Sequence, residues 1–273
     1  MFKKIKRLKD IFFSLILINR HSFTFEDVIV FKSLKESDLY SYGYIWIVND
    51  YINYPYYREK FIAGKNFPAG IGYTVNYLER INSNIKILKI LTITFDSYSQ
   101  INYDKYKSSC YDIFDIILFV PNFGRDLGAH KYTLLFLNKY NINPCSKVIL
   151  SNSSFVPNNN ICNINFWDCI NHYNNAILGS SYCFGPKYFI KKYRHLQSFY
   201  LVLNYKYYSC LFSSINFRNN TKDHVIRNGE VEIVNLATKF GIDLFICYDG
   251  FSFYLWGPGE FRYVSYDHRL KSF

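Results

Sequence analysis

Ile113-Phe-Asp-Ile-Ile-Leu-Phe-Val-Pro-Asn-Phe-Gly-Arg-Asp-Leu-Gly-Ala129 is the stretch from which the fold can be read. Residues 113–121 form an apolar run of β-branched and aromatic side chains, which is typical of a buried parallel strand. Apolar residues recur over Lys131–Tyr140 and predict a short helix. A polar, glycine-containing turn therefore lies between a buried strand and a helix. In an open α/β sheet this is the carboxyl end of a strand, where ligands bind.

The turn at 122–129 carries residue types that suit an anionic ligand. Gly124 and Gly128 permit a positive φ or a close approach of the backbone. Arg125 can form two hydrogen bonds to a phosphate, and Asp126 can accept from a sugar hydroxyl or hold a metal ion. From these residues alone, an equally good interpretation is a structural turn whose Arg–Asp pair caps the next helix.

Length and composition favour one main α/β domain. The chain has 273 residues, enough to bury a sizeable core, and its 7 prolines give no sign of a long linker. The net charge of +11 suits nucleotide diphosphates, anionic lipid headgroups or nucleic acid without choosing among them. The 7 cysteines form no Cys-x-x-Cys pair, which argues against a zinc site and a disulfide framework and favours reduced thiols in the cytosol.

Residues 1–21 form a basic amphipathic segment ahead of the domain expected over 22–273. Five cations precede a short apolar run, 11–18, that is too short to span a bilayer. Such a segment suits an anionic membrane surface, and it predicts a cytoplasmic protein held peripherally on the inner face of the plasma membrane. An ordinary first helix packed on the domain is an equally good interpretation.

Short β-prone runs alternate with mixed segments along the chain, which predicts an α/β sheet. The runs are 28–31, 44–48, 87–95, 113–120, 147–150 and 176–179. Helical spacing predicts helices over 74–81, 187–203 and 230–240, the last ended by Gly241. The aromatic stretch 245–273 is consistent with a strand pair or an irregular cap. Neither a G-x-G-x-x-G fingerprint nor a Walker A pattern is present.

Several segments, in this order, resemble the rhamnan-synthesis-F-like glycosyltransferases of bacterial surface polysaccharides. The segments are Asn122–Ala129, Val148–Phe155, Ala176–Gly179, His195–Phe199 and Val225–Glu230. The resemblance covers roughly residues 28 to 243, and its specificity comes from the set rather than from any one motif. It implies a GT-A-like nucleotide-binding sheet. It also implies transfer of a sugar from a nucleotide-sugar donor to a glycan or lipid-linked glycan acceptor, as in lipopolysaccharide or capsule synthesis.

The resemblance assigns roles to particular residues. The expected donor-binding residues are Asn122, Gly124, Arg125, Asp126, Asn152 and Ser153. Glu230 is the candidate general base toward the acceptor hydroxyl, and Asp126 is the second candidate catalytic residue. His195, Gln197 and Ser198 are expected to position donor or acceptor. For Glu230 the alternative is a carboxylate that only stabilises the first turn of a helix, and Glu232 is a nearby rival.

The chain departs from the family pattern at one position. Where Asn-Asp-Ser is expected, it has Asn152-Ser153-Ser154, and no Asp-x-Asp occurs anywhere. Binding of Mn²⁺ or Mg²⁺ is therefore an open expectation, with Asp126 as the candidate ligand. Otherwise Arg125, Lys131 and neighbouring basic residues neutralise the leaving diphosphate directly, or activity has been lost.

Two other functions are weighed against an enzyme. A non-catalytic, membrane-peripheral component of a polysaccharide assembly complex would keep the basic N-terminus and the fold. A single-stranded nucleic-acid-binding protein would use the basic charge and the 27 Tyr and 26 Phe. The scattered Lys and Arg residues and the lack of an RRM or KH signature argue against nucleic acid as a partner.

Overall fold

The structure of the chain is a computed structural model. It describes residues 22–35, 38–62, 65–81, 84–154, 167, 170–171, 173–179, 182–183, 195–196, 198, 200–247, 252–257 and 260–265. The basic segment 1–21 and Gln197 lie outside the described residues. None of the described helices is both long enough and apolar enough to cross a membrane.

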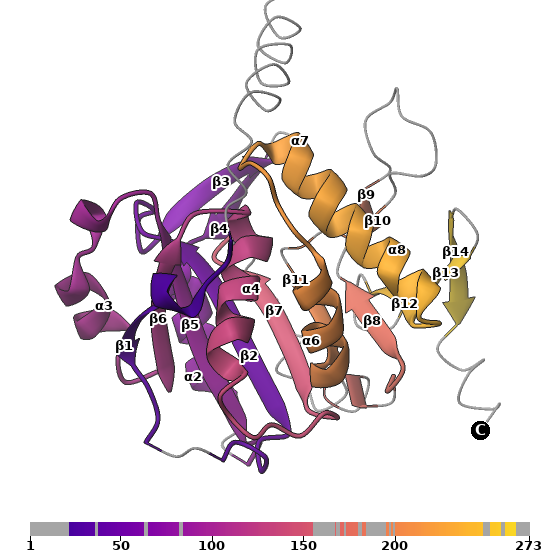
Figure 1. Ribbon diagram of the computed structural model, residues 1–273, viewed down its shortest axis with the longest axis horizontal. Helices are drawn as coiled ribbons and strands as arrows, with labels where there is room; N and C mark the ends of the chain where they lie inside the picture. Colours follow the sequence, from indigo (N-terminus) through magenta and orange to yellow (C-terminus); the bar gives the residue numbers. More distant parts are fainter. Residues whose placement is uncertain are drawn as a thin grey trace, which may run out of the picture.

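Parallel strands form the centre of a large mixed sheet (Figure 1). They are β2 (Tyr44–Tyr51), β5 (Ile87–Phe95), β6 (Ile116–Pro121) and β7 (Lys147–Asn152), in the spatial order β6-β5-β2-β7. Nearly all their residues are buried, as expected of strands covered on both faces. The α/β class and the strands expected from these apolar runs are confirmed, although β6 begins three residues later than predicted.

Further strands extend the sheet on both sides. The antiparallel strand β1 (Ile29–Lys32) pairs with β6, and β11 (Tyr200–Asn204) runs antiparallel between β7 and β8 (Ala176–Gly179). Beyond β8 come β12 (Asp243–Cys247), β13 (Ser252–Gly257) and β14 (Glu260–Ser265), so strands rather than an irregular cap occupy the described part of 245–273.

The helix expected over 187–203 is wrong wherever the structure describes that range. Residues His195–Leu196 form β10, which pairs with β9 (Tyr182–Cys183), and Tyr200–Asn204 form β11. All five residues of β11 are buried. Because a short apolar run that is buried on both faces has no amphipathic period, its spacing cannot separate strand from helix.

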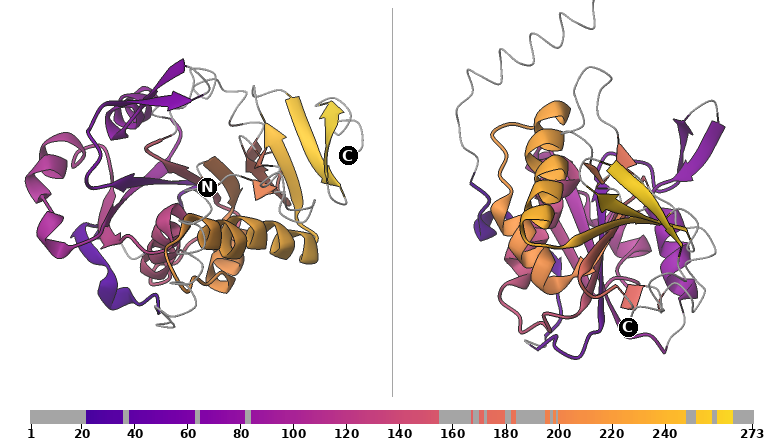
Figure 2. Two further views of the ribbon diagram at one scale, coloured as in Figure 1. Left: turned by 90° about the horizontal axis from the view of Figure 1, so that it is seen from above. Right: turned by 90° about the vertical axis from the view of Figure 1, so that its right-hand side faces the viewer.

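Helices cover both faces of the sheet and make three layers (Figure 2). One face carries α4 (Arg125–Leu137), α6 (Tyr205–Ser214) and α8 (Val231–Lys239). The other face carries α2 (Ile71–Arg80) and α3 (Tyr103–Ser109). The two layers bury separate hydrophobic clusters against the sheet. Short 3₁₀ turns at Phe25–Asp27 and Tyr98–Gln100 complete the helical elements of the N-terminal half.

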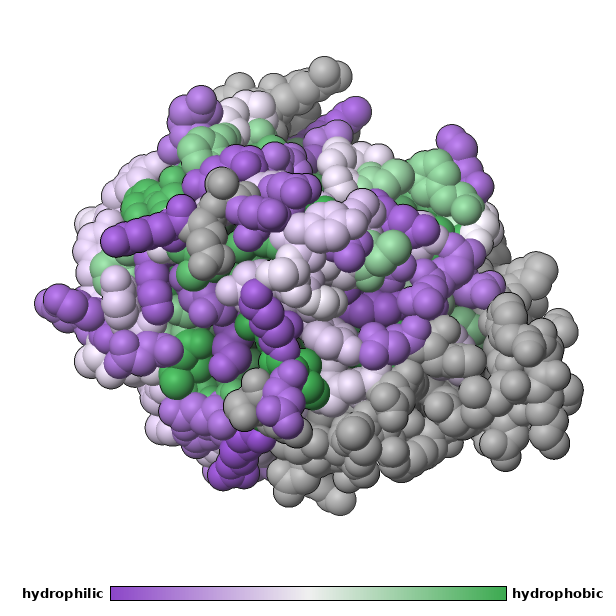
Figure 3. All heavy atoms as spheres, turned by 90° about the horizontal axis from the view of Figure 1, so that it is seen from below, coloured by the Kyte–Doolittle hydropathy of each residue, from purple (hydrophilic) through white to green (hydrophobic). Residues whose placement is uncertain are grey.

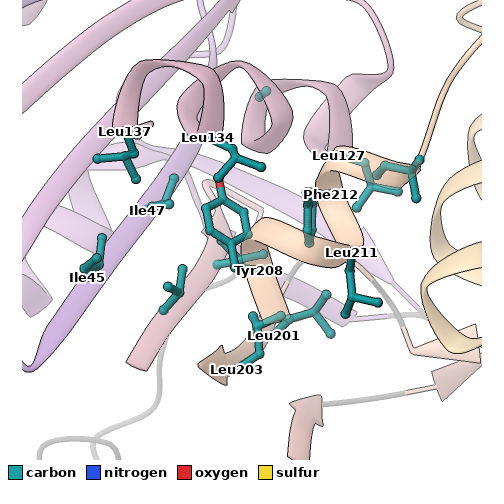
Figure 4. Packing of buried hydrophobic residues seen from close by; sticks show 14 of the residues in the cluster. Ile45, Ile47, Leu127, Leu134, Leu137, Leu201, Leu203, Tyr208, Leu211 and Phe212 are labelled. Carbon is teal, nitrogen blue, oxygen red and sulfur yellow. The ribbon is translucent and has the colours of Figure 1, made fainter. Parts of the chain in front are cut away.

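Leucine, isoleucine and aromatic side chains fill the layer between the sheet and α4 and α6 (Figure 4). Leu134 and Leu137 of α4 lie near Ile47 of β2, and Tyr208 and Phe212 of α6 fill the space beside them. All five side chains are essentially inaccessible to solvent. The first turn of α4 is therefore anchored to the sheet by the apolar turns that follow it.

The helix expected to begin at Glu230 begins earlier. Residues Lys222–Val225 form α7, Ile226–Glu230 form a π-helical segment, and α8 continues without a break to Lys239. Glu230 is therefore inside a helical rod and not in the first turn of a helix. The expected end is confirmed, because Gly241 has φ of 66° and Ile242 N donates to Ala237 O, as in a Schellman-type cap.

A two-stranded hairpin stands out from the body of the sheet (Figure 2). It consists of β3 (Arg58–Ile62) and β4 (Lys65–Ala69), with Arg58 opposite Ala69 at its base. The base is tied to the sheet, since Gly70 N donates to Ser153 O at 2.6 Å. The hairpin therefore starts and ends at the carboxyl end of the parallel strands.

Candidate functional site at the carboxyl end of the parallel strands

The order of the parallel strands reverses between β2 and β7. From β2 the chain moves outward through β5 to β6 on one side, and it then crosses to β7 on the other side of β2. Ligands of open α/β sheets bind outside the carboxyl ends of the strands at such a switch point. Asn49 near the end of β2 and Asn152 at the end of β7 are partners in the strand register there.

The carboxylate of Asp126 lies between these two asparagines. Asn49 Nδ2 donates to one of its oxygens at 2.7 Å, and Asn152 Nδ2 donates to the other at 2.5 Å. Burial raises the pKa of Asp126, the two amide hydrogen bonds oppose this, and the neighbouring Glu230 raises the pKa further. The sequence-predicted carboxylate is thus held at the switch point by two residues from different strands.

Glycine geometry turns the chain from β6 into α4. Gly124 has φ of 76°, and Arg125 itself has φ of 54°, a conformation that is uncommon outside glycine. A Cβ on Gly128 would lie 1.6 Å from the Phe123 carbonyl oxygen, so only glycine allows this approach. The expectation that both glycines meet a backbone requirement is confirmed, and the requirement places Asp126 in the first turn of α4.

Asn220 fixes the same turn from outside. Its Oδ1 accepts from Gly124 N at 3.1 Å, and its Nδ2 donates to Asn122 O at 2.6 Å. The exposed Arg125 donates through Nε to Asn220 O at 3.4 Å, so it does not pair with Asp126 in this conformation. The side chain of Asn122 points to Asp96 at the end of β5, donating to it at 2.8 Å.

Glu230 reaches the same region from the π-helical segment. It is half-buried and close enough to Asp126 to influence its pKa. Gly229 makes this approach possible, because a Cβ there would lie 2.3 Å from Leu127 Cδ1 at the start of α4. Glu230 Oε1 also accepts from Ser198 N at 2.8 Å. The structure therefore brings together four of the predicted residues, Asp126, Asn152, Glu230 and Ser198, while His195 contributes its backbone to β10.

The residues after β7 divide between the two faces of the sheet. Asn152 faces Asp126, and its Oδ1 accepts from Ser154 N at 3.0 Å. Ser153 is buried and hydrogen-bonds to the buried Asp50 of β2, whose pKa is raised by burial and partly restored by that bond. A carboxylate is thus already present next to position 153, and a second one there would meet like-charge repulsion.

Three residues near this site were not predicted from the sequence. Asn49 and Asp50 do have a signal, because a polar pair directly follows the apolar run 44–48. Arg58 has none, since it lies in a tyrosine-rich segment without a motif. Its Nη2 donates to Ser154 Oγ at 2.8 Å, and its guanidinium lies 3.6 Å from the centre of the Tyr54 ring.

Asp126 is not a free metal ligand in this arrangement. Both of its oxygens face amide N–H donors, and a cation could replace them only if an asparagine turned away. Within the described ranges, no group of three His, Cys, Asp or Glu residues could hold a metal ion. Binding of Mn²⁺ or Mg²⁺ stays a prediction, and no step below depends on it.

A cavity of about 350 Å³ lies at the opposite, amino ends of β2 and β7, where Gly43, Tyr44, Ser146 and Lys147 line it. Two of its polar side chains bond to backbone carbonyls: Ser146 Oγ donates to Tyr42 O and Lys147 Nζ donates to Tyr173 O. The molecule seen from below is mainly hydrophilic, with small, separate apolar areas (Figure 3). No ligand is therefore inferred at this cavity.

A scan against models of known protein families found no match, and a search of curated proteins found none either.

Proposed function

We propose that this protein is a glycosyltransferase of GT-A-like fold that moves a sugar from a nucleotide-sugar donor to a growing cell-surface glycan. The observation that carries the proposal is the Asp126 carboxylate, held by Asn49 and Asn152 at the topological switch point with Glu230 beside it. A polar site at this position is the usual location for a nucleotide in an open α/β sheet.

Sugar transfer makes three demands, and Glu230 and Asp126 can meet the first two of them. The acceptor hydroxyl loses its proton as its oxygen bonds to the anomeric carbon, and Glu230 is the base that takes the proton. Positive charge develops on the sugar, and the Asp126 carboxylate is placed to stabilise it. The bond from the anomeric carbon to the phosphate oxygen breaks, and the departing nucleotide diphosphate needs cationic or N–H donors.

Two features support Glu230 as the base rather than as a helix-stabilising residue. It is not in the first turn of its helical rod, so the macrodipole alone does not explain it. It also ends a π-helical segment, and such segments are often found at functional sites.

The acceptor and the location belong to the same proposal. The basic segment 1–21 would hold the enzyme on the anionic inner face of the plasma membrane, where a lipid-linked glycan acceptor is accessible. Vesicle binding by the full chain, compared with a chain starting at Ser22, tests this part by itself.

The function is tested by offering the full chain a panel of sugar nucleotides, with and without Mn²⁺ or Mg²⁺. We expect one donor to raise the melting temperature and to be hydrolysed slowly or transferred to an added glycan. Asp126→Asn should abolish that turnover while the protein stays folded. Asp104→Asn is the matched control, since it makes the same chemical change at an exposed carboxylate of α3.

Stabilisation by a donor without any turnover would instead favour the non-catalytic component of an assembly complex. Full activity in Asp126→Asn would remove this carboxylate from the mechanism. Loss of activity in Asp104→Asn as well would mean that the assay reports general damage.

A further inference from the structure

The cations first expected to neutralise the diphosphate are engaged elsewhere. Lys131 Nζ donates to Ser213 O at 3.3 Å, to Asn216 Oδ1 at 3.0 Å and to Ile215 O. It therefore satisfies backbone carbonyls at the end of α6, which would otherwise lack partners. Arg125 points to Asn220, on the outer side of the turn. Neither side chain is directed to the space above Asn49 and Asn152.

Arg58 is a cation of a different kind. It is half-buried at the base of the β3–β4 hairpin, and one of its terminal nitrogens donates to Ser154 Oγ. Its Nε is enclosed without a hydrogen-bond partner, and no carboxylate in the described part of the chain forms an ion pair with it. A guanidinium has five N–H donors, so most of the capacity of Arg58 is unused.

A continuous chain of hydrogen bonds connects Arg58 with Asp126. Arg58 bonds to Ser154 Oγ, Ser154 N bonds to Asn152 Oδ1, and Asn152 Nδ2 bonds to Asp126. The chain crosses the carboxyl end of β7 at the switch point. The stretch Asn152-Ser153-Ser154 thus joins Arg58, a cation without an ion-pair partner among the described residues, to the candidate catalytic carboxylate.

We propose that Arg58, positioned by Ser154 and Tyr54, binds the diphosphate of the nucleotide at this edge of the sheet. The identity of the anion rests on the proposed function, whereas the anion site itself does not. The planar fork of a guanidinium matches two phosphate oxygens, and the ring of Tyr54 holds its plane. In the reaction, the electron pair of the broken bond stays on the phosphate oxygen, and Arg58 neutralises that added charge.

The Tyr54 contact and the Ser154 hydrogen bond also explain how a long, flexible side chain is kept in place before the anion arrives. A preorganised cation gains more on binding than one that must first be ordered. The missing carboxylate at Ser153 is consistent with this arrangement, because a diphosphate bound through Arg58 needs no acidic residue to hold a cation there.

Binding of inorganic pyrophosphate to the full chain tests the site directly. Titration calorimetry is carried out in EDTA at about 0.15 M ionic strength, so that neither a metal ion nor diffuse charge supplies the contact. Arg58→Ala should weaken pyrophosphate binding by about 10- to 100-fold, and Arg58→Lys should restore part of it. Lys60→Ala is the matched control, because it removes an exposed cation two residues along the same strand.

Absence of pyrophosphate binding in the wild type, or equal losses in Arg58→Ala and Lys60→Ala, would overturn the proposal. Thermal unfolding shows whether Arg58→Ala is folded, and Arg58→Lys decides the question if it is not. Sugar transfer is measured separately on the same proteins. If the wild type binds pyrophosphate through Arg58 but transfers no sugar, the proposal of an anion site stands and the proposed glycosyltransferase activity is refuted.

Discussion

The two ends of the central parallel strands differ in how their polar groups are satisfied. At the amino ends, beside the cavity, Ser146 and Lys147 bond to backbone carbonyls, and the Oδ1 atom of Asn204, opposite Lys147, is enclosed without a partner among the described residues. At the carboxyl ends, Asn49 Oδ1 and Arg58 Nε are enclosed without partners. Buried polar groups are normally paired, so unpaired ones call for an explanation such as a ligand. The difference between the two ends is one of charge: the carboxyl ends have an enclosed cationic donor, Arg58 Nε, whereas the unpaired atom at the amino ends is a neutral amide oxygen.

The largest expected effect is on turnover when the carboxylate pair at the carboxyl end is broken. Glu230→Gln should lower kcat by about 10²–10⁴-fold, since a positioned base contributes that much, while donor binding survives. A residue that only stabilises its helix would instead cost roughly 0.3–1 kcal/mol of unfolding free energy and leave turnover nearly unchanged. Measuring kcat and denaturant unfolding on one preparation separates the two. Glu232→Gln controls for the nearby rival carboxylate.

The next largest effect is on stability, and it compares a glycine at the carboxyl ends of the strands with one at the amino ends. Gly128→Ala forces a Cβ to 1.6 Å from the Phe123 carbonyl oxygen, and it should lower the unfolding free energy by about 3 kcal/mol or more. Gly43→Ala at the amino ends has nothing within 4 Å of its new Cβ and should change stability by less than about 1 kcal/mol. Chemical denaturation measures both. Equal stabilities would show that the turn before α4 is looser than the contacts indicate.

The smallest effect is a gain of stability from removing the charge of the half-buried Asp126. Folding raises the pKa of Asp126, so the ionised form is less favourable in the native protein than in the unfolded chain. The protonated carboxyl group of Asp126 therefore contributes stability that is fully present below the unfolded pKa. That contribution is lost as the pH rises through the folded pKa. Asp126→Asn should therefore be more stable than wild type at neutral pH, by about 0.5–2 kcal/mol.

The gain should shrink as the pH falls and be absent below the unfolded pKa of the carboxyl group. Urea midpoints at neutral pH and at acidic pH, for wild type and variant, give the measurement. A destabilised variant at neutral pH would mean that the hydrogen bonds from Asn49 and Asn152 outweigh the cost of burial.

The sequence predicted the part of the fold that depends on local pattern. Largely apolar runs identified β5 and β8 with both of their bounds, because strands covered on two faces have few polar positions. The same property hid β11, which has equally uniform burial but runs antiparallel between β7 and β8. β11 follows β8 after a long connection and is inserted between β7 and β8. No pattern within its own residues indicates that position in the sheet.

The residues of the candidate site likewise divide into those that the sequence predicted and those that it did not. Asp126 could be predicted because its turn, its glycines and the preceding strand are adjacent in the chain. Arg58 could not, because its position depends on the hydrogen bond from Gly70 N to Ser153 O, which joins residues far apart in sequence. The pairing of Ser153 with Asp50 is also tertiary, and it supplies a physical reason for the departure from Asn-Asp-Ser.

A π-helical turn contains one residue more than an α-helical turn, so Ile226–Glu230 changes the direction of its own side chains while the helix continues through it. Removing one residue and closing the rod as a regular α-helix would leave the segments on either side in nearly the same rotational phase. Val225 before the segment and Val231 after it now both face the interior. In a rod shortened by one residue, both valines could keep facing the interior, whereas the side chains within the segment would change direction. Deleting one of these five residues should therefore disturb the approach of Glu230 to Asp126 more than the packing of the rod.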